Sequence, residues 1–154
     1  MKSVESNQKE IAQNRYTVFT LSDHYFALEI SYIKEILKFP ILTRLPGKNK
    51  LFCGSFNLRG KIITVVDIRQ LLKLEISENK INEMVVLTEY KGNLLGISVD
   101  QVMDLMNIEE LKIQLPSRKI PASLAKYVSG FLEKENFGTV YLLDLIKLIG
   151  TLNS

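Results

Sequence analysis

The stretch GSFNLRGKIITVVDIRQLL, residues 54–72, carries the pattern that decides the fold. The stretch has the pattern of two strands around the turn Asn57-Leu58-Arg59-Gly60, the second of them rich in β-branched residues, and Gly60 suits a position of positive φ. Asp67 follows the second run, and the apolar spacing behind it predicts a short helix over residues 68–74. The stretch therefore predicts a strand, a tight turn, a strand and a short helix that begins at an aspartate.

The same unit recurs near the end of the chain, where LLDLIKLI (residues 142–149) matches VVDIRQLL (residues 65–72), with an aspartate at the same junction. A second alignment, at one constant offset and without a gap, joins two sets of apolar residues upstream of these units. The sets are Phe26, Leu28, Ile30, Ile33, Ile36 and Leu37 against Leu95, Ile97, Val99, Val102, Leu105 and Met106. Each half is thus predicted to contain a hairpin, a short helix, a strand–turn–strand unit and a last helix.

The short helix after each hairpin is expected between Ser31 and Pro40 in the first half and over residues 100–106 in the second. Repeated units of short strands predict a mainly β fold with two small barrels and short helices. Each barrel alone would bury too little surface, so the two should pack together and leave a groove at their seam. We expect two intertwined barrel subdomains over residues 15–150, with tails at residues 1–14 and 151–154.

Composition bounds the class of protein. The chain has 154 residues, of which 46% are hydrophobic and 24% charged, and a formal net charge of only +3, which argues against a nucleic-acid surface. Cys53 and His24 are the only residues of their kinds, so neither a disulfide nor a metal centre is expected. The polar start of the chain lacks a signal peptide, and no apolar run could span a bilayer, which together predict a cytoplasmic protein.

No sequence motif for catalysis is present: the chain lacks a glycine-rich phosphate loop, HExxH, CxxC and GxSxG. Asp67 and Asp144 could form a carboxylate pair, but their matched places at helix starts favour a capping role. Arg59 has two interpretations that the sequence does not separate: its guanidinium ties down the turn, or it meets carboxylates of a partner. We predict no enzyme, no catalytic residue and no cofactor.

Five segments, taken in order, resemble the CheW family of chemotaxis coupling proteins. They are GSFNLRGKIITVVDIRQLL (54–72), FTLSDHYFALEISYIKEIL (19–37), TRLPG (43–47), LLGISVDQVMDLM (94–106) and YVSGFLEKENFGTVYLLDLIKLI (127–149). The resemblance covers about residues 15 to 150. Two positions depart from the family pattern: Thr64 stands where proline is common, and the turn at Phe137-Gly138-Thr139 has no close counterpart.

The resemblance implies a fold of two packed five-stranded SH3-like barrels and a non-enzymatic scaffold in signal transduction. Such an adaptor joins the coiled-coil tip of chemoreceptors to the regulatory domain of a CheA-type histidine kinase in receptor arrays, reaching the membrane only through the receptors. The residues expected to line the receptor groove are Ile33, Glu35, Ile36, Arg59, Val99, Val102 and Leu105. Those expected to contact the kinase are Phe39, Thr43, Leu45, Leu115 and Ile120.

Two alternatives stay open at this stage. A CheW-like adaptor of a pilus or gliding pathway would have the same sequence features. A small-barrel nucleic-acid binder would alternate aromatic and basic residues on one face, whereas the aromatic residues here lie in apolar runs and basic clusters such as Lys48-Asn49-Lys50 are short.

Overall fold

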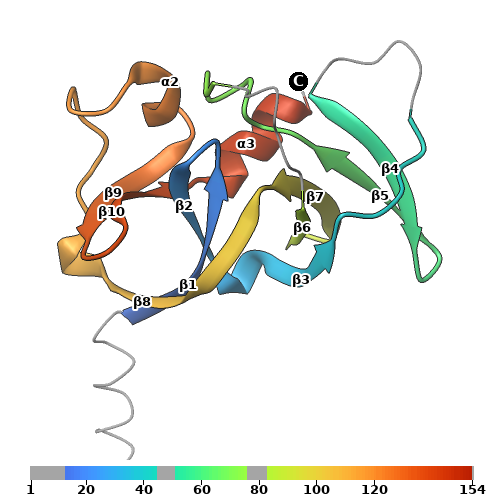
Figure 1. The fold of residues 1–154 in the computed structure, drawn as a ribbon, viewed down its shortest axis with the longest axis horizontal. Coiled ribbons are helices and arrows are strands. Elements are labelled where there is room, and N and C mark those ends of the chain that lie inside the picture. The colour runs from blue at the N-terminus through green and yellow to red at the C-terminus, as the bar shows by residue number, and fades with distance from the viewer. Residues whose placement is uncertain (1–12, 45–50, 76–82, 154) are drawn as a thin grey trace, which may run out of the picture.

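The computed structural model describes residues 13–44, 51–75 and 83–153, and it contains two five-stranded β-sheets (Figure 1). The first sheet, in the order β8-β1-β2-β10-β9, consists of β1 (Gln13–Leu21), β2 (His24–Glu29), β8 (Gln101–Glu109), β9 (Val128–Lys134) and β10 (Gly138–Leu143). The second, in the order β3-β6-β7-β5-β4, consists of β3 (Ile33–Lys38), β4 (Phe52–Leu58), β5 (Lys61–Val66), β6 (Met84–Tyr90) and β7 (Asn93–Val99). The predicted mainly β class is confirmed.

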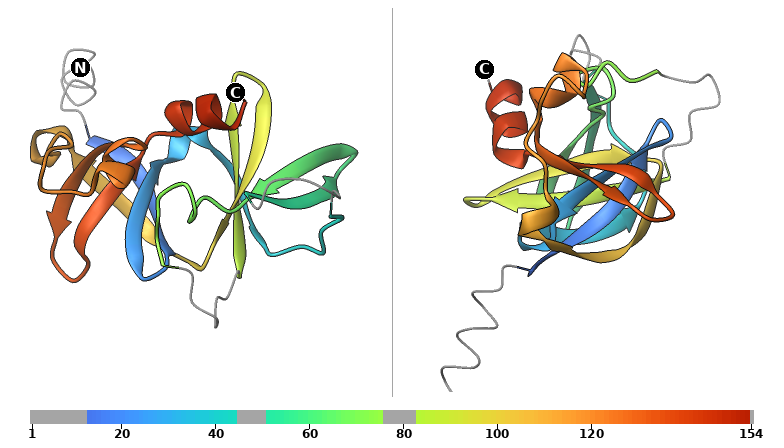
Figure 2. Two further views of the ribbon diagram at one scale, coloured as in Figure 1. Left: turned by 90° about the horizontal axis from the view of Figure 1, so that it is seen from above. Right: turned by 90° about the vertical axis from the view of Figure 1, so that its left-hand side faces the viewer.

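The described helices are short: η1 (Ile30–Tyr32), η2 (Glu110–Lys112), α2 (Ala122–Ala125) and α3 (Leu145–Leu152). The last of them follows the expected pattern, because the Asp144 carboxylate accepts a hydrogen bond from the Lys147 backbone N–H at 3.1 Å. Leu145 and Leu148 of α3 are buried, and the helix lies over the junction of the two sheets (Figure 2).

Two of the predicted helices are strands, β3 in place of the segment after Ser31 and β8 in place of residues 100–106. The apolar residues there recur at a spacing of i and i+3, which is typical of a helix. A β-bulge produces the same spacing, because one extra residue lets side chains three positions apart share a face. Each strand has such a register shift, between Ile33 and Glu35 in β3, and opposite Thr17 and Phe19 of β1 in β8.

The helix predicted after Asp67 is also wrong, because residues 68–73 form turns. One hydrogen bond of the α-helical type is present, from Leu72 N to Ile68 O at 3.1 Å, and one of the 3-10 type, from Lys73 N to Gln70 O at 3.2 Å. The positive φ of Lys73, 53°, then breaks the helical conformation.

Neither sheet is built from one repeat alone. The sheet of β1 and β2 is completed by β8, β9 and β10, and the sheet of β6 and β7 is completed by β3, β4 and β5. Figure 1 shows this exchange as blue strands beside orange and red ones. Four strand pairings make the exchange: the equivalent parallel pairs β2 with β10 and β5 with β7, and the equivalent antiparallel pairs β1 with β8 and β3 with β6. The repeats are therefore intertwined and cannot fold as separate barrels.

Both sheets close on themselves through equivalent backbone bridges. After β3, Thr43 exchanges two hydrogen bonds of 2.7 and 2.9 Å with Ser55 of β4. After β8, Gln114 does the same with Phe131 of β9, at 2.8 and 2.9 Å. Gly54 precedes the first bridge, and a Cβ there would lie 2.6 Å from the Thr43 carbonyl oxygen. The close approach of the closing segment therefore requires glycine.

The larger core lies between the sheets and beneath α3. Its fully buried members are Phe19, Leu21, Phe26, Leu28, Val66, Ile68, Leu72, Val86, Ile97, Val99, Val128, Leu145 and Leu148. A smaller cluster fills the barrel of the first sheet and includes Val18, Ala27, Ile108, Val140 and Leu142. Because the larger core is shared, the seam between the sheets is a fixed feature of the fold.

Candidate protein-interaction site

An exposed ion pair marks the second sheet at the turn between β4 and β5. Arg59 donates two hydrogen bonds to Glu35 of β3, from Nη1 to Oε2 at 2.9 Å and from Nη2 to Oε1 at 3.1 Å. The turn holds Arg59 at a φ of 51°, while the Gly60 N–H donates to the Asn57 side-chain oxygen at 3.0 Å. This bidentate geometry ties the turn to β3 and fixes the direction of the guanidinium.

The pair is accessible, since the Arg59 side chain is 72% exposed and that of Glu35 is 31% exposed. The hydrogen bonds from Arg59 hold the pKa of the Glu35 carboxyl below its ordinary value of 4.5. Both interpretations of Arg59 are therefore compatible with the structure: it ties down the turn and remains open to a partner.

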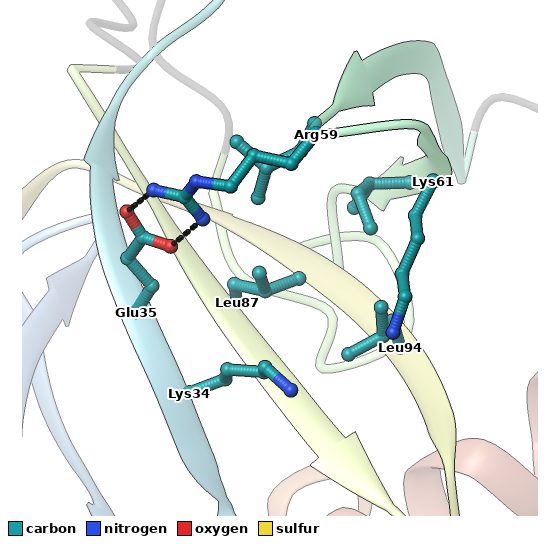
Figure 3. Close-up of a pocket in the computed structure, with 8 residues that line it drawn as sticks. Lys34, Glu35, Arg59, Lys61, Leu87 and Leu94 are labelled. Atoms are coloured by element: carbon teal, nitrogen blue, oxygen red, sulfur yellow. Dashed lines mark hydrogen bonds and ion pairs between the residues drawn. The ribbon is translucent and has the colours of Figure 1, made fainter.

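The neighbouring residue on β3 forms a second pair, from Lys34 Nζ to Glu89 Oε2 at 2.9 Å. The two pairs border a small cavity of about 140 Å³ with an apolar floor (Figure 3). Its lining residues are Lys34, Glu35, Leu58, Arg59, Lys61, Ile63, Leu87 and Leu94.

Two exposed aliphatic side chains occupy equivalent places on the bulged strands. Ile36 of β3 is 37% exposed and pairs with Val86, while Leu105 of β8 is 53% exposed and pairs with Thr17. Directly opposed residues in an antiparallel pair share a face, and both Val86 and Thr17 are buried. The two repeats thus each present one large aliphatic side chain at the edge of a buried face.

The other residues expected to contact a receptor are less accessible. Ile33 and Val102 are partly buried and pack against the core between the sheets. Val99 is completely buried in that core, so its expected place in an exposed groove is wrong. The error arises because β7 is a central strand, buried on both faces, and the repeat pattern does not distinguish core from rim.

The residues expected to contact a kinase also differ widely in their exposure to solvent. Leu115 is 78% exposed, Thr43 is exposed and Phe39 is half-buried. Ile120 is buried with an exposure of 7% and belongs to the core, so the structure contradicts its place at an interface. Leu45 lies outside the described residues.

Sequence reasoning missed a buried ionic cluster at the crossing between the sheets. Arg69 is 1% exposed, and its Nη1 donates to Asp67 Oδ1 at 2.9 Å while its Nη2 pairs with Asp100. Asp100 Oδ2 in turn accepts from the Ser22 backbone N–H at 2.8 Å. One guanidinium therefore connects the end of β5, the link from β7 to β8 and the turn between β1 and β2. The spacing of Asp67 and Arg69 alone could have suggested a local pair, but nothing in the sequence indicated Asp100.

It also missed two exposed apolar side chains: Ile41, in the segment after β3, is 97% exposed, and Ile62, on β5, is 67% exposed. The apolar runs that contain them predict buried strands, but Ile41 lies outside the strands, and Ile62 pairs with Asn57 of β4 with its side chain exposed.

The described residues also bear on other kinds of site. Within the described ranges, no helix combines the length and apolar character that a membrane crossing requires. Nor do those ranges gather three or more His, Cys, Asp or Glu side chains in a way that could hold a metal ion. Asp144 caps α3, as predicted. The helix-capping role predicted for Asp67 is wrong, because no helix follows it; its carboxylate instead accepts hydrogen bonds from the backbone N–H and the guanidinium of Arg69, at 3.1 and 2.9 Å.

A comparison with family models decides the family, because the model described as the CheW-like domain matches residues 15–152. The chain belongs to the CheW-like domain family. This is a family of scaffolding proteins and not of enzymes.

Individual relatives are distant but cover most of the chain. The chemotaxis protein CheW of Bacillus subtilis is 26% identical over 119 residues, covering 77% of this chain and 76% of that protein. CheW of Klebsiella aerogenes is 25% identical over 143 residues, covering 92% and 85%. Protein PilI of Pseudomonas aeruginosa is 25% identical over 119 residues, covering 76% and 66%.

A solved structure supports the fold. The crystal structure of the scaffolding protein TtCheW from Thermoanaerobacter tengcongensis matches this CheW-like chain with a TM-score of 0.75. The match covers 86% of this chain and 89% of the other at 24% sequence identity. The arrangement of two intertwined sheets is therefore shared with that protein.

Proposed function

We propose that this CheW-like chain couples chemoreceptors to a CheA-type histidine kinase in cytoplasmic signalling arrays. The observation that carries the proposal is the pair of equivalent bulged strands, β3 and β8, which present Ile36 and Leu105 beside the buried seam. A helical hairpin needs an apolar groove with a few fixed charges. The aliphatic edges and the Glu35–Arg59 pair supply that combination.

The receptor tip would lie along this seam. Ile36 and Leu105 supply exposed apolar contacts, and Ile33 and Val102 support them from the partly buried layer. Loss of exposed aliphatic area on binding stabilises the complex by about 25 cal/mol per Å². The loop residues Phe39, Thr43 and Leu115 stay as proposed contacts of the kinase regulatory domain.

The first test is recovery of partners from the native cell. The tagged full chain is used in a pull-down, and the bound proteins are identified by mass spectrometry. We expect a CheA-type kinase together with chemoreceptors. Because relatives are named both CheW and PilI, the kinase recovered also decides whether the pathway is chemotactic or pilus-linked. Recovery of neither a kinase nor a receptor by a folded chain would refute the coupling role.

The second test places a charge in the groove. Leu105→Asp should weaken receptor binding by at least about 10-fold, because an unpaired carboxylate would be moved out of water. Ile146→Asp is the matched control, since Ile146 is 47% exposed on α3, which makes no part of the proposed groove. Receptor-dependent kinase activation is measured with both variants after their thermal melts have been compared. Equal activation by the two would remove β8 from the receptor site.

The third test addresses the ion pair. Arg59→Glu should leave the fold intact and impair receptor-dependent activation, because two carboxylates would then face each other at the rim. The exchange of both charges, Glu35→Arg with Arg59→Glu, restores the pair within the protein but reverses its direction. If the exchanged variant activates the kinase normally, Arg59 acts only by holding its turn; if it remains impaired, Arg59 meets the partner.

A further inference from the structure

Among the described residues, the two barrels differ at one pair of equivalent ends: the end of the second barrel has a cavity, whereas two aromatic rings pack together at the end of the first. In the barrel of the second sheet, this end is bounded by the turn after β4 and by the start of β7, where Leu94 lies. The equivalent residue at the start of β2 is Tyr25, which occupies the same place in the repeat. Tyr25 packs edge-on against Phe137, with their ring centroids 5.0 Å apart.

Phe137 comes from a longer turn. The turn between β9 and β10 spans residues 135–137, whereas the turn between β4 and β5 contains only Arg59 and Gly60. The added residue places an aromatic ring on the core of the first barrel, against which Tyr25 and Phe137 both pack. The first barrel therefore fills this end with a side chain of its own turn.

The described residues that line the same end of the second barrel include no aromatic side chain. The barrel's cavity of about 140 Å³ is lined by the exposed side chains of Arg59 and Lys61 and by the apolar side chains of Ile63, Leu87 and Leu94, of which Ile63 and Leu87 are buried and form the floor. In another protein, an apolar cavity of roughly 150 Å³ accommodates a benzene molecule. The cavity is therefore of the size of one aromatic ring, which is the group that fills the other barrel.

The rim of the cavity determines what accompanies that ring. The charged residues that line the cavity are the cations Lys34, Arg59 and Lys61 and the carboxylate Glu35. When Glu89, the partner of Lys34 outside the lining, is counted as well, one net positive charge remains. Figure 3 shows Lys61 lying along the opening toward Leu94, and Lys34 reaching toward it from β3. Charge complementarity thus favours an acidic group beside the inserted ring.

We propose that this end of the second barrel is a binding pocket for a phenylalanine side chain on an acidic turn of a partner protein. The partner supplies in trans the aromatic residue that Phe137 supplies within the first barrel. The inference deepens the proposed function, because Glu35 and Arg59 belong both to this rim and to the proposed receptor site.

The test uses the full chain with methyl and amide labels and measures NMR shifts on titration with 3-phenylpropanoate, which joins a phenyl ring to a carboxylate. We expect saturable shifts of the Leu87 and Leu94 methyl groups with a dissociation constant in the range of about 1 to 10 mM, as befits a fragment. The uncharged 3-phenylpropanamide should bind about five-fold more weakly, because it lacks attraction to Lys61.

Two variants and a control locate the site. Leu94→Tyr introduces the residue that the first barrel has at this place and should abolish the shifts by filling the opening. Lys61→Glu leaves the floor intact and should weaken binding of the anion by at least about five-fold. Lys147→Glu, a matched charge reversal on α3, should leave binding unchanged.

A second probe tests whether the occupant is a protein segment. A blocked hexapeptide with one phenylalanine between glutamates should shift the same methyl groups, and its alanine counterpart should not. Absence of saturable shifts up to about 20 mM fragment, or equal binding by Leu94→Tyr, overturns the proposal. These titrations contain neither kinase nor receptor, so a negative titration would refute the pocket without refuting the coupling function. A negative pull-down would refute the coupling function without refuting the pocket.

Discussion

Removal of Arg69 is the perturbation for which the structure gives the sharpest expectation. The guanidinium is 1% exposed and contacts Asp67 and Asp100, whose side chains are 8% and 23% exposed. Arg69→Met keeps most of the side-chain volume but removes the positive charge, so the carboxylates of Asp67 and Asp100 lose their contacts with the guanidinium in a largely buried site. Breaking a buried ion pair from one side costs about 3 to 5 kcal/mol.

We expect the lower end of that range, about 3 kcal/mol, because the partial exposure of Asp100 lets water solvate its carboxylate. In a protein of this size, 1 kcal/mol shifts the melting temperature by about 2 to 4 °C, so the variant should melt about 6 to 12 °C lower. Urea unfolding followed by far-UV circular dichroism measures the free energy directly. Arg118→Met is the control, since Arg118 is exposed, and it should change stability by less than about 0.5 kcal/mol.

A triple variant separates lost charge balance from lost packing. If the cost arises from uncompensated carboxylates, Arg69→Met combined with Asp67→Asn and Asp100→Asn should be more stable than Arg69→Met alone, although it carries more substitutions. If the triple variant is instead less stable than the single one, the cluster acts through its hydrogen bonds to the backbone. A loss below about 1 kcal/mol for Arg69→Met would refute the reasoning altogether.

Three further outcomes are expected. Gly54→Ala should lower the free energy of unfolding, measured in urea, by at least about 2 kcal/mol, because the added Cβ would lie 2.6 Å from the Thr43 carbonyl oxygen and the backbone φ at this position is 146°. Gly150→Ala is the control: no atom lies within 4 Å of the added Cβ, so the substitution should be neutral or stabilising by up to about 1 kcal/mol. The carboxyl of Glu35 should titrate below 4.5 in a carbon-detected NMR experiment, and its pKa should return toward 4.5 in Arg59→Gln. Since the folded pKa is the lower one, the pair stabilises the protein at neutral pH and this contribution is lost as the pH falls through that pKa. Asp144→Ala should destabilise the chain by about 1 kcal/mol through loss of the α3 cap, seen as faster amide exchange at Lys147.

The strands and turns of this fold were predictable where local chemistry determines them. The hairpins follow from alternating runs around short polar turns, and the cap of α3 follows from Asp144 ahead of an apolar stripe. The bulged strands were not predictable, since Ile33 and Ile36 have the spacing of both a helix and a bulged strand. What decides between them is the row of hydrogen bonds from β6 and β1, which exists only once the sheets are assembled.

The candidate site was predictable only in part, for a similar reason. Glu35 and Arg59 belong to strand and turn segments that the sequence identifies, but their bidentate pairing depends on how β3 and β4 close the second sheet. Val99 has the same apolar character as Leu105, yet one is buried and the other 53% exposed, because β7 is central in its sheet and β8 lies at an edge. Exposure is a property of the assembled sheets, so the repeat pattern could not separate the two residues.

The near symmetry of the repeats makes their differences informative about how a partner is oriented. Ile36 and Leu105 are equivalent and offer similar aliphatic contacts on either side of the seam. Such a surface alone would accept a helical hairpin in two opposite directions with similar affinity. The charges are not equivalent: Glu35 is held by Arg59, whereas Asp104, at the same place on β8, accepts a hydrogen bond from the backbone N–H of Leu105 at 2.8 Å. Burial of apolar area contributes affinity in both orientations of the hairpin, whereas a fixed charge on one side of the seam favours one orientation over the other. The Glu35–Arg59 pair is therefore where this CheW-like chain would distinguish the two orientations of a proposed receptor tip.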